Sequence, residues 1–200
     1  MRKENAMRKE LIEQLNHYEP FNEQEAADRT AILSELKENS HIFFRENRLA
    51  HMTASGWVLN SAHDRILMCF HNIYHSWSWL GGHADGREDL LAAAIAEVKE
   101  ESGLTDVAPV TDDVFSLEVL TVDGHEKNGQ YVPSHLHLNI TYLLEADDSQ
   151  ALRAKTDENS AVAWFLPGEA AERSSEEWFK ARIYAKLNRK LLQKGIISGL

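Results

Sequence analysis

The chain has 200 residues, of which 43% are hydrophobic, and this is enough for one domain with a sizeable core and an added helical arm. Its formal net charge of −11 argues against binding a nucleic acid backbone by bulk electrostatics, although divalent cations would let it hold a polyphosphate. Cys69 is the single cysteine, which excludes a disulfide framework, and no apolar run approaches the ~20 residues of a membrane span. The charged beginning is not typical of a signal peptide, and we expect a cytoplasmic protein without nucleic acid or membrane partners.

The first part of the chain predicts an arm of two helices. Apolar residues within 11–15 recur at helical spacing and predict a short amphipathic helix that ends before Pro20. A second helix is expected to begin at Asn22, where Glu25 completes a capping-box pattern, and to end at 39–40.

This arm, residues 1–50, is expected to pack on a domain formed by residues 51–200. Covering a sheet is its expected role, while shaping a homodimer or a substrate pocket remains an alternative. The first four residues are repeated at 7–10, so we assign residues 1–6 no role in the fold.

From residue 51 onward the sequence has the patterns of strands with few helices. A polar loop is expected at 123–128, Pro167-Gly168 is expected to end the last strand, and residues 174–177 are expected to cap a last helix. This order predicts an α/β/α sandwich on a mixed β-sheet. The predicted strands are 53–59, 65–70, 114–122, 135–144 and 161–166.

The most informative segment is a glycine-rich turn at Gly81-Gly82 followed by an acidic helix. At about 100° per residue, Glu97, Glu100 and Glu101 fall within an arc of roughly 100° on that helix. Like charges at this spacing repel one another, and a hard divalent cation with oxygen ligands would remove that cost. A left-handed cap at the glycine of position 103 is expected to end the helix.

The spacing of this segment resembles the signature of the Nudix hydrolase family, G-x5-E-x7-R-E-U-x-E-E-x-G-U, in which U is apolar. One position departs from it, because Ala96 stands where the family has arginine. The matching residues are Gly82, Glu88, Glu97, Val98, Glu100, Glu101, Gly103 and Leu104.

The resemblance implies a Nudix-like fold and hydrolysis of a pyrophosphate bond in a nucleoside diphosphate-linked or other diphosphate-containing small molecule, with Mg²⁺ or Mn²⁺ as cofactor. It also implies that Glu97 and Glu101 are the primary metal ligands. Glu100 is then a further ligand with a part in catalysis, and the carbonyl of Gly81 joins them. Glu88 ordinarily pairs with the missing arginine, so its role in catalysis stays open.

Residues outside the signature supply the general base in many members of the family. Glu158, in the loop before the last predicted strand, is the first choice, with Glu126 and Asp123 as alternatives. Gly82 is expected to let a phosphate approach the backbone, and Trp79 either stacks on a ring of the substrate or belongs to the core.

Histidines are frequent near these segments. His135 and His137 are two residues apart on a predicted strand and therefore face the same side. Together with His71, His75 and His83 they would contact phosphates, form a second metal site, or simply line a half-buried strand.

Two other functions stay open. An isopentenyl-diphosphate isomerase shares the fold, but that family has a cysteine just before the glycine-histidine pair, where this chain has Gly81. A non-catalytic nucleotide-binding regulatory module would use the same residues without cleavage. The sequence does not specify the substrate, because loops and the arm choose the leaving group.

Overall fold

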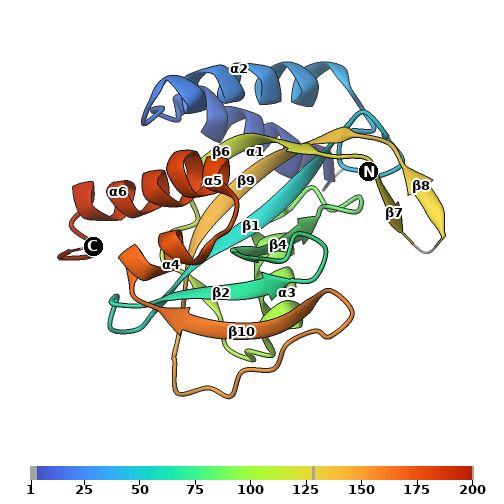
Figure 1. Ribbon diagram of the computed structural model, residues 1–200. Helices are drawn as coiled ribbons and strands as arrows, with labels where there is room; N and C mark the ends of the chain where they lie inside the picture. The colour runs from blue at the N-terminus through green and yellow to red at the C-terminus, as the bar shows by residue number, and fades with distance from the viewer. Residues whose placement is uncertain (1–3, 128, 200) are drawn as a thin grey trace. The chain divides into compact units, whose positions relative to one another are not determined.

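The computed structural model describes residues 4–127 and 129–199 (Figure 1). These residues form two compact units. The first unit comprises described residues within 1–54, 82–93 and 113–141, and the second comprises those within 55–81, 94–112 and 142–200. The helices are α1 (Glu4–His17), α2 (Glu23–Glu38), α3 (Leu90–Ser102), α4 (Pro167–Arg173), α5 (Glu177–Phe179) and α6 (Ala185–Gln193), with a π-helical turn at Lys180–Tyr184. The strands are β1 (Ala50–Asn60), β2 (Ile66–His71), β3 (Ser76–Ser78), β4 (Leu80–His83), β5 (Ala108–Pro109), β6 (Ser116–Val122), β7 (His125–Lys127), β8 (Gln130–Val132), β9 (His135–Ala146) and β10 (Asn159–Phe165).

In the first unit, α1 and α2 form the N-terminal arm. Residues 4–6, which the sequence prediction left outside the fold, belong to α1, and residues 1–3 lie outside the described residues. The guanidinium of Arg8 donates to the carbonyls of Leu36 and Asn39, each at 2.8 Å. A cation on these carbonyls stabilises the C-terminal end of α2, where the helix dipole is negative.

The start of α2 corrects one detail of the predicted capping box. Asn22 Oδ1 accepts the N–H of Glu25 at 3.0 Å, as expected. The Glu25 carboxylate, however, accepts the N–H of Phe21 at 2.8 Å and the hydroxyl of Tyr18 at 2.7 Å. The fully buried carboxylate of Glu25 therefore accepts hydrogen bonds from these two donors and from the hydroxyl of Ser116, which lies 2.8 Å away on β6.

Helix α2 packs along β6 within the same unit. Asp28 Oδ2 accepts the N–H of Val119 at 3.0 Å, so a side chain of the arm satisfies a backbone donor of the strand. Leu15 of α1 and Ile32 of α2 are fully buried. The arm therefore covers β6 through both apolar and polar contacts.

The strands form a mixed sheet, as the sequence predicted. Leu136 N–H donates to the Leu49 carbonyl at 2.9 Å, and Thr53 Oγ1 donates to Asn139 Oδ1 at 2.9 Å. The partners advance in the same direction along the chain, so β1 and β9 run parallel. Strand β6 pairs with β9 antiparallel in the first unit, and in the second unit β2 lies between β1 and β10 with antiparallel pairing on both sides.

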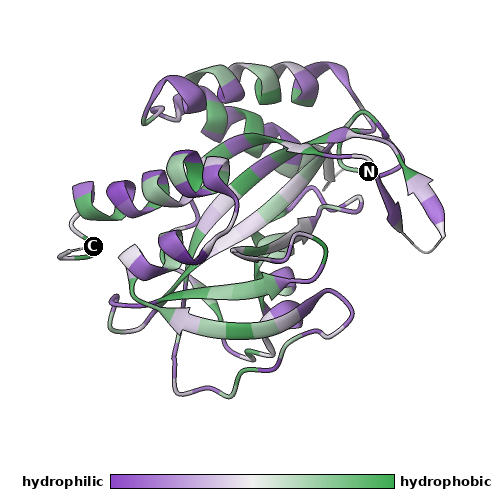
Figure 2. Ribbon diagram, in the orientation of Figure 1, coloured by the Kyte–Doolittle hydropathy of each residue, from purple (hydrophilic) through white to green (hydrophobic). Residues whose placement is uncertain are grey.

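The core of the second unit contains a cluster of aromatic side chains. Trp57 stacks on Tyr184 with ring centroids 5.6 Å apart, and Trp79 meets the same tyrosine edge-on at 5.8 Å. Cys69 is fully buried in β2, the apolar run that Figure 2 shows in green. The sequence prediction of Cys69 as a core residue agrees with this burial.

Two segments differ from their predicted structure. The loop expected at 123–128 contains β7, which pairs with β8 as a hairpin of mostly exposed polar residues that gives no apolar signal. The last helix expected after 174–177 is present as a continuous helical segment, in which a π-helical turn at Lys180–Tyr184 lies between α5 and α6, but helix α4, which Pro167 opens, was not predicted.

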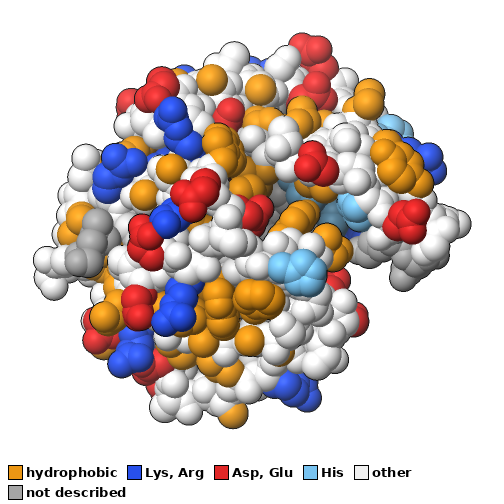
Figure 3. Space-filling view, in the orientation of Figure 1, with side chains coloured by type: hydrophobic (Ala, Val, Ile, Leu, Met, Phe, Trp, Pro, Cys, Tyr) orange, Lys and Arg blue, Asp and Glu red, His pale blue; other side chains and the backbone are white. Residues whose placement is uncertain are grey.

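On the face drawn in Figure 3, acidic and basic side chains are interspersed. Within the part of the chain that the structure describes, no helix has the length and apolarity needed to cross a membrane.

Candidate functional site

Helix α3 carries the acidic residues of the candidate site, and both of its ends are fixed by local chemistry. At the start, Asp89 Oδ1 accepts the N–H of Ala92 at 3.0 Å. At the other end Gly103 has φ +76° and its N–H donates to the Lys99 carbonyl at 2.9 Å, which is the predicted left-handed cap. A Cβ at position 103 would also lie only 2.9 Å from Cβ of Arg153.

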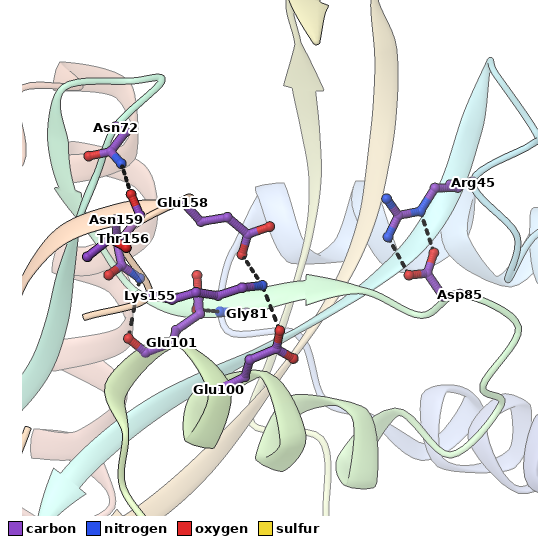
Figure 4. A network of polar contacts seen from close by, with 10 residues as sticks. All are labelled: Arg45, Asn72, Gly81, Asp85, Glu100, Glu101, Lys155, Thr156, Glu158 and Asn159. Carbon is purple, nitrogen blue, oxygen red and sulfur yellow. Dashed lines mark hydrogen bonds and ion pairs between the residues drawn. The ribbon is translucent and has the colours of Figure 1, made fainter. Parts of the chain in front are cut away.

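Glu101 is the buried member of the acidic group, with 4% of its surface exposed. Its Oε2 accepts the N–H of Gly81 at 2.9 Å, which fixes the orientation of the carboxylate (Figure 4). Burial, together with the nearby carboxylates of Glu97 and Glu158, raises the pKa of Glu101 to about 8, although the hydrogen bond from Gly81 opposes this shift. The carboxylate is therefore held in a place where its negative charge lacks full compensation.

Lys155 joins two other carboxylates in the same unit. Its Nζ lies 2.7 Å from Oε1 of Glu100 and 2.7 Å from Oε2 of Glu158 (Figure 4). Burial by itself lowers the pKa of Lys155, but the hydrogen bonds to the two glutamates outweigh it and raise the pKa above the usual range. Sequence reasoning missed Lys155, since its only signal was its place three residues before Glu158.

Glu158 lies in a turn directly before β10. Its N–H donates to the Lys155 carbonyl at 2.9 Å, and its own carbonyl accepts the N–H of Asn72 at 2.9 Å. The neighbouring Asn159 is fully buried. These backbone bonds place the Glu158 side chain in the network of Glu100 and Lys155.

The donor set of this network suits a hard divalent cation. Glu97, Glu100, Glu101 and Glu158 supply carboxylate oxygens against the single ammonium of Lys155. Mg²⁺ and Mn²⁺ prefer such oxygen donors, and a bound cation would offset the desolvation and repulsion that act on Glu101. The contact described for Gly81 is made by its N–H, and ligation through its carbonyl stays a prediction.

Gly82, His83 and Glu88 belong to the first unit. Glu88 is half-buried in the segment before α3, and no arginine is available at position 96 to pair with it. Sequence reasoning missed an ion pair close to His83. The guanidinium of Arg45 donates two hydrogen bonds to the carboxylate of Asp85, two residues after His83 (Figure 4). The hydrogen bond from Arg45 lowers the pKa of Asp85, so this pair is ionised at neutral pH.

Four histidines of the first unit come together: His51, His83, His135 and His137. One ring nitrogen of each lies within 4.8 Å of those of the others. The predicted neighbours of this group, His71 and His75, are not in it and belong to the second unit. His51 was missed, because a lone histidine at the start of a buried strand gives no signal of its own.

The remaining predicted residues have simpler surroundings. Trp79 is 9% exposed and packs edge-on against Phe179 and Tyr184, which supports the core interpretation over ring stacking with a substrate. The alternative general bases Asp123 and Glu126 are both exposed. Asp123 precedes β7 in the first unit, and Glu126 lies within that strand.

The NUDIX domain model matches residues 50–187. Among curated proteins no sequence matches. The Ap4A hydrolase of C. elegans in a binary complex has a TM-score of 0.53 and 20% identity, and the match covers 72% of this chain and 97% of that one. The dihydroneopterin triphosphate pyrophosphohydrolase of E. coli has a TM-score of 0.52 and 15% identity over 71% of this chain and 95% of that one.

These structural matches confirm the predicted Nudix-like α/β fold, and the sequence match covers more than half of the chain. The chain therefore belongs to the Nudix family, as an enzyme of the pyrophosphohydrolase type.

Proposed function

We propose that this enzyme hydrolyses a pyrophosphate bond in a nucleoside diphosphate-linked or other diphosphate-containing small molecule, with Mg²⁺ or Mn²⁺ as cofactor. Glu97 and Glu101 are the primary ligands in this proposal, with Glu100 and the carbonyl of Gly81 beside them. The observation that carries it is the buried carboxylate of Glu101, held by Gly81 among other carboxylates within the family-matched region. Burying a carboxylate among other carboxylates destabilises its charged form, and a bound divalent cation would offset this cost because it is coordinated by their oxygens.

Different residues have different roles in the proposed hydrolysis. A bound divalent cation neutralises phosphoryl oxygens and favours attack by water. Glu158 is the proposed general base that takes the proton from this water, and the hydrogen bond that Lys155 donates to its carboxylate at 2.7 Å holds it in the network. The backbone at Gly82 has no Cβ and admits a phosphate closely.

Cys69 bears on the isomerase alternative. Its thiol is fully buried, and burial raises its pKa to about 12, so it is not a reactive thiolate near neutral pH. Gly81 occupies the position at which the isomerase family has its cysteine. These observations favour hydrolysis over isomerisation.

Turnover of a substrate panel tests the proposal. The panel contains Ap4A, dihydroneopterin triphosphate, nucleoside diphosphate sugars and dinucleotides, each with Mg²⁺ and with Mn²⁺, and release of phosphate or nucleotide is measured. We expect hydrolysis by the wild type, a loss of 100-fold or more with Glu101→Gln, and no loss with the exposed control Glu38→Gln. Turnover no greater than that of Glu101→Gln on every compound would contradict the proposed metal-dependent hydrolysis, and tight binding without cleavage would indicate the regulatory module instead.

Two expectations from the sequence stay predictions. Light scattering during size-exclusion chromatography tests the homodimer, and fractionation of the cells that produce the protein tests a cytoplasmic location.

A further inference from the structure

The four-histidine cluster (His51, His83, His135 and His137) lies in the first unit and shares no residue with the carboxylate network of the second. Strand β9 contributes two members, β1 contributes His51, and the last residue of β4 contributes His83. The cluster therefore connects three strands that are far apart in the sequence.

Two of these rings have a fixed hydrogen-bond orientation. Nδ1 of His51 lies 3.0 Å from the Asn47 carbonyl, and Nδ1 of His135 lies 2.9 Å from the Pro133 carbonyl. A carbonyl only accepts hydrogen bonds, so Nδ1 must carry the proton in both rings. In the neutral imidazole Nε2 is then a lone pair, and metal-bound histidines ordinarily use their other ring N–H in this way.

The Nε2 lone pair of His51 accepts no hydrogen bond from any of the described residues. Nε2 of His51 is buried and makes no hydrogen bond there, which is a costly arrangement for a polar atom. The ring lies with its centroid 4.9 Å from that of His135 and 5.0 Å from those of His83 and His137. A ligand at the centre of the cluster would satisfy this atom.

The spacing of the nitrogens suits a transition metal. With Zn–N bonds of about 2.0–2.1 Å, neighbouring nitrogens in a tetrahedral site are about 3.3–3.4 Å apart. Nε2 of His135 and Nε2 of His137 are 3.2 Å apart, and the whole set lies within 4.8 Å. A small contraction of the other rings would complete the tetrahedron.

The hydrogen-bond orientation of the rings favours a cation over a phosphate. An anion requires N–H donors from these rings, whereas His51 and His135 direct lone pairs toward the cluster. Neutral imidazoles of this kind bind transition metals and not Mg²⁺.

We propose that His51, His83, His135 and His137 form a tetrahedral site for a transition metal, with Zn²⁺ as the ion. Four protein ligands leave no open position for water or substrate, so the ion has a structural role and ties β1, β4 and β9 together. The proposal does not depend on the function proposed for the carboxylates.

Metal titration of the chelator-treated full chain, in excess Mg²⁺ that saturates the carboxylates, tests the site. We expect one Zn²⁺ per chain by elemental analysis, intense visible bands of tetrahedral Co²⁺, and a higher Tm with Zn²⁺. The half-buried His83 and His135 are the ligands to replace, and we expect His83→Gln and His135→Gln to weaken Zn²⁺ binding by about 100-fold. His125→Gln is the matched control, because its ring lies 6.4 Å from that of His135 but outside the cluster.

The double variant Glu97→Gln, Glu101→Gln distinguishes the histidine site from the carboxylates. It should keep its affinity for Zn²⁺ while it loses the Mg²⁺-dependent activity. Zn²⁺ binding that disappears in this variant, or that is equal in the wild type and His135→Gln, would overturn the site. The Co²⁺ spectrum of the wild type tests the site even if a histidine variant fails to fold. Weak bands, which are typical of octahedral Co²⁺, would contradict a tetrahedron of four imidazole ligands.

Discussion

The side-chain nitrogen of Lys155 lies 2.7 Å from Oε1 of Glu100, so a cation of the protein itself is bound to one of the proposed metal ligands. A divalent ion that binds Glu100 must share it with this ammonium or displace it. Glu100 is exposed, and such pairs contribute about 1 kcal/mol or less, so we expect Lys155→Met to tighten Mg²⁺ binding by about 3- to 5-fold. Calorimetric titration measures this, with the exposed Lys194→Met as control. Weaker binding by Lys155→Met alone would show that the ammonium helps to organise the site.

The second prediction concerns pH and Glu101. Its pKa is about 8 in the folded chain against an ordinary value of 4.5, so the folded state holds this proton more tightly than the unfolded state does. The resulting stability is fully present below pH 4.5 and is lost as the pH rises toward 8. In chelator, urea unfolding should show that the wild type loses more free energy of unfolding between pH 5 and pH 8 than Glu101→Gln does. Equal pH dependence in the two proteins would contradict the raised pKa.

Glu158 provides the third prediction. If Glu158 accepts the proton of the attacking water, Glu158→Gln should lower kcat by about 10²- to 10⁴-fold while Mg²⁺ affinity changes little. Steady-state kinetics with the substrate identified in the panel measures this loss. Asp123→Asn and Glu126→Gln should retain activity, and a comparable loss in either of these would move the role of base to that residue.

Gly103 provides a prediction about stability. Alanine there must adopt φ near +76° and brings its Cβ to 2.9 Å from Cβ of Arg153. We expect Gly103→Ala to lower the free energy of unfolding by about 1–3 kcal/mol. Thermal and urea unfolding measure the change, with Gly199→Ala as control because nothing lies within 4 Å of a Cβ at that position. A loss no larger than that of the control would mean that the end of α3 tolerates a side chain.

Local patterns account for the parts that the sequence predicted well. The acidic stripe and Gly103 predicted helix α3 and its end, and β-forming runs predicted most of the long strands. Residues such as Lys155 and His51 acquire their roles only through neighbours from other segments, which spacing along one element does not reveal. The β7–β8 hairpin was missed because its residues are mostly exposed and polar, so that burial does not impose an apolar alternation.

The bonds from the arm to β6 limit how the enzyme can be shortened. The NUDIX match begins at residue 50, so a shortened protein would be designed by removing the helices before that residue. Such a truncation would remove the acceptor of the Val119 amide and one of the two acceptors of the Ser116 hydroxyl, and would open the apolar side of β6 to water. We therefore expect a catalytic fragment to fold only if it retains the helices before residue 50.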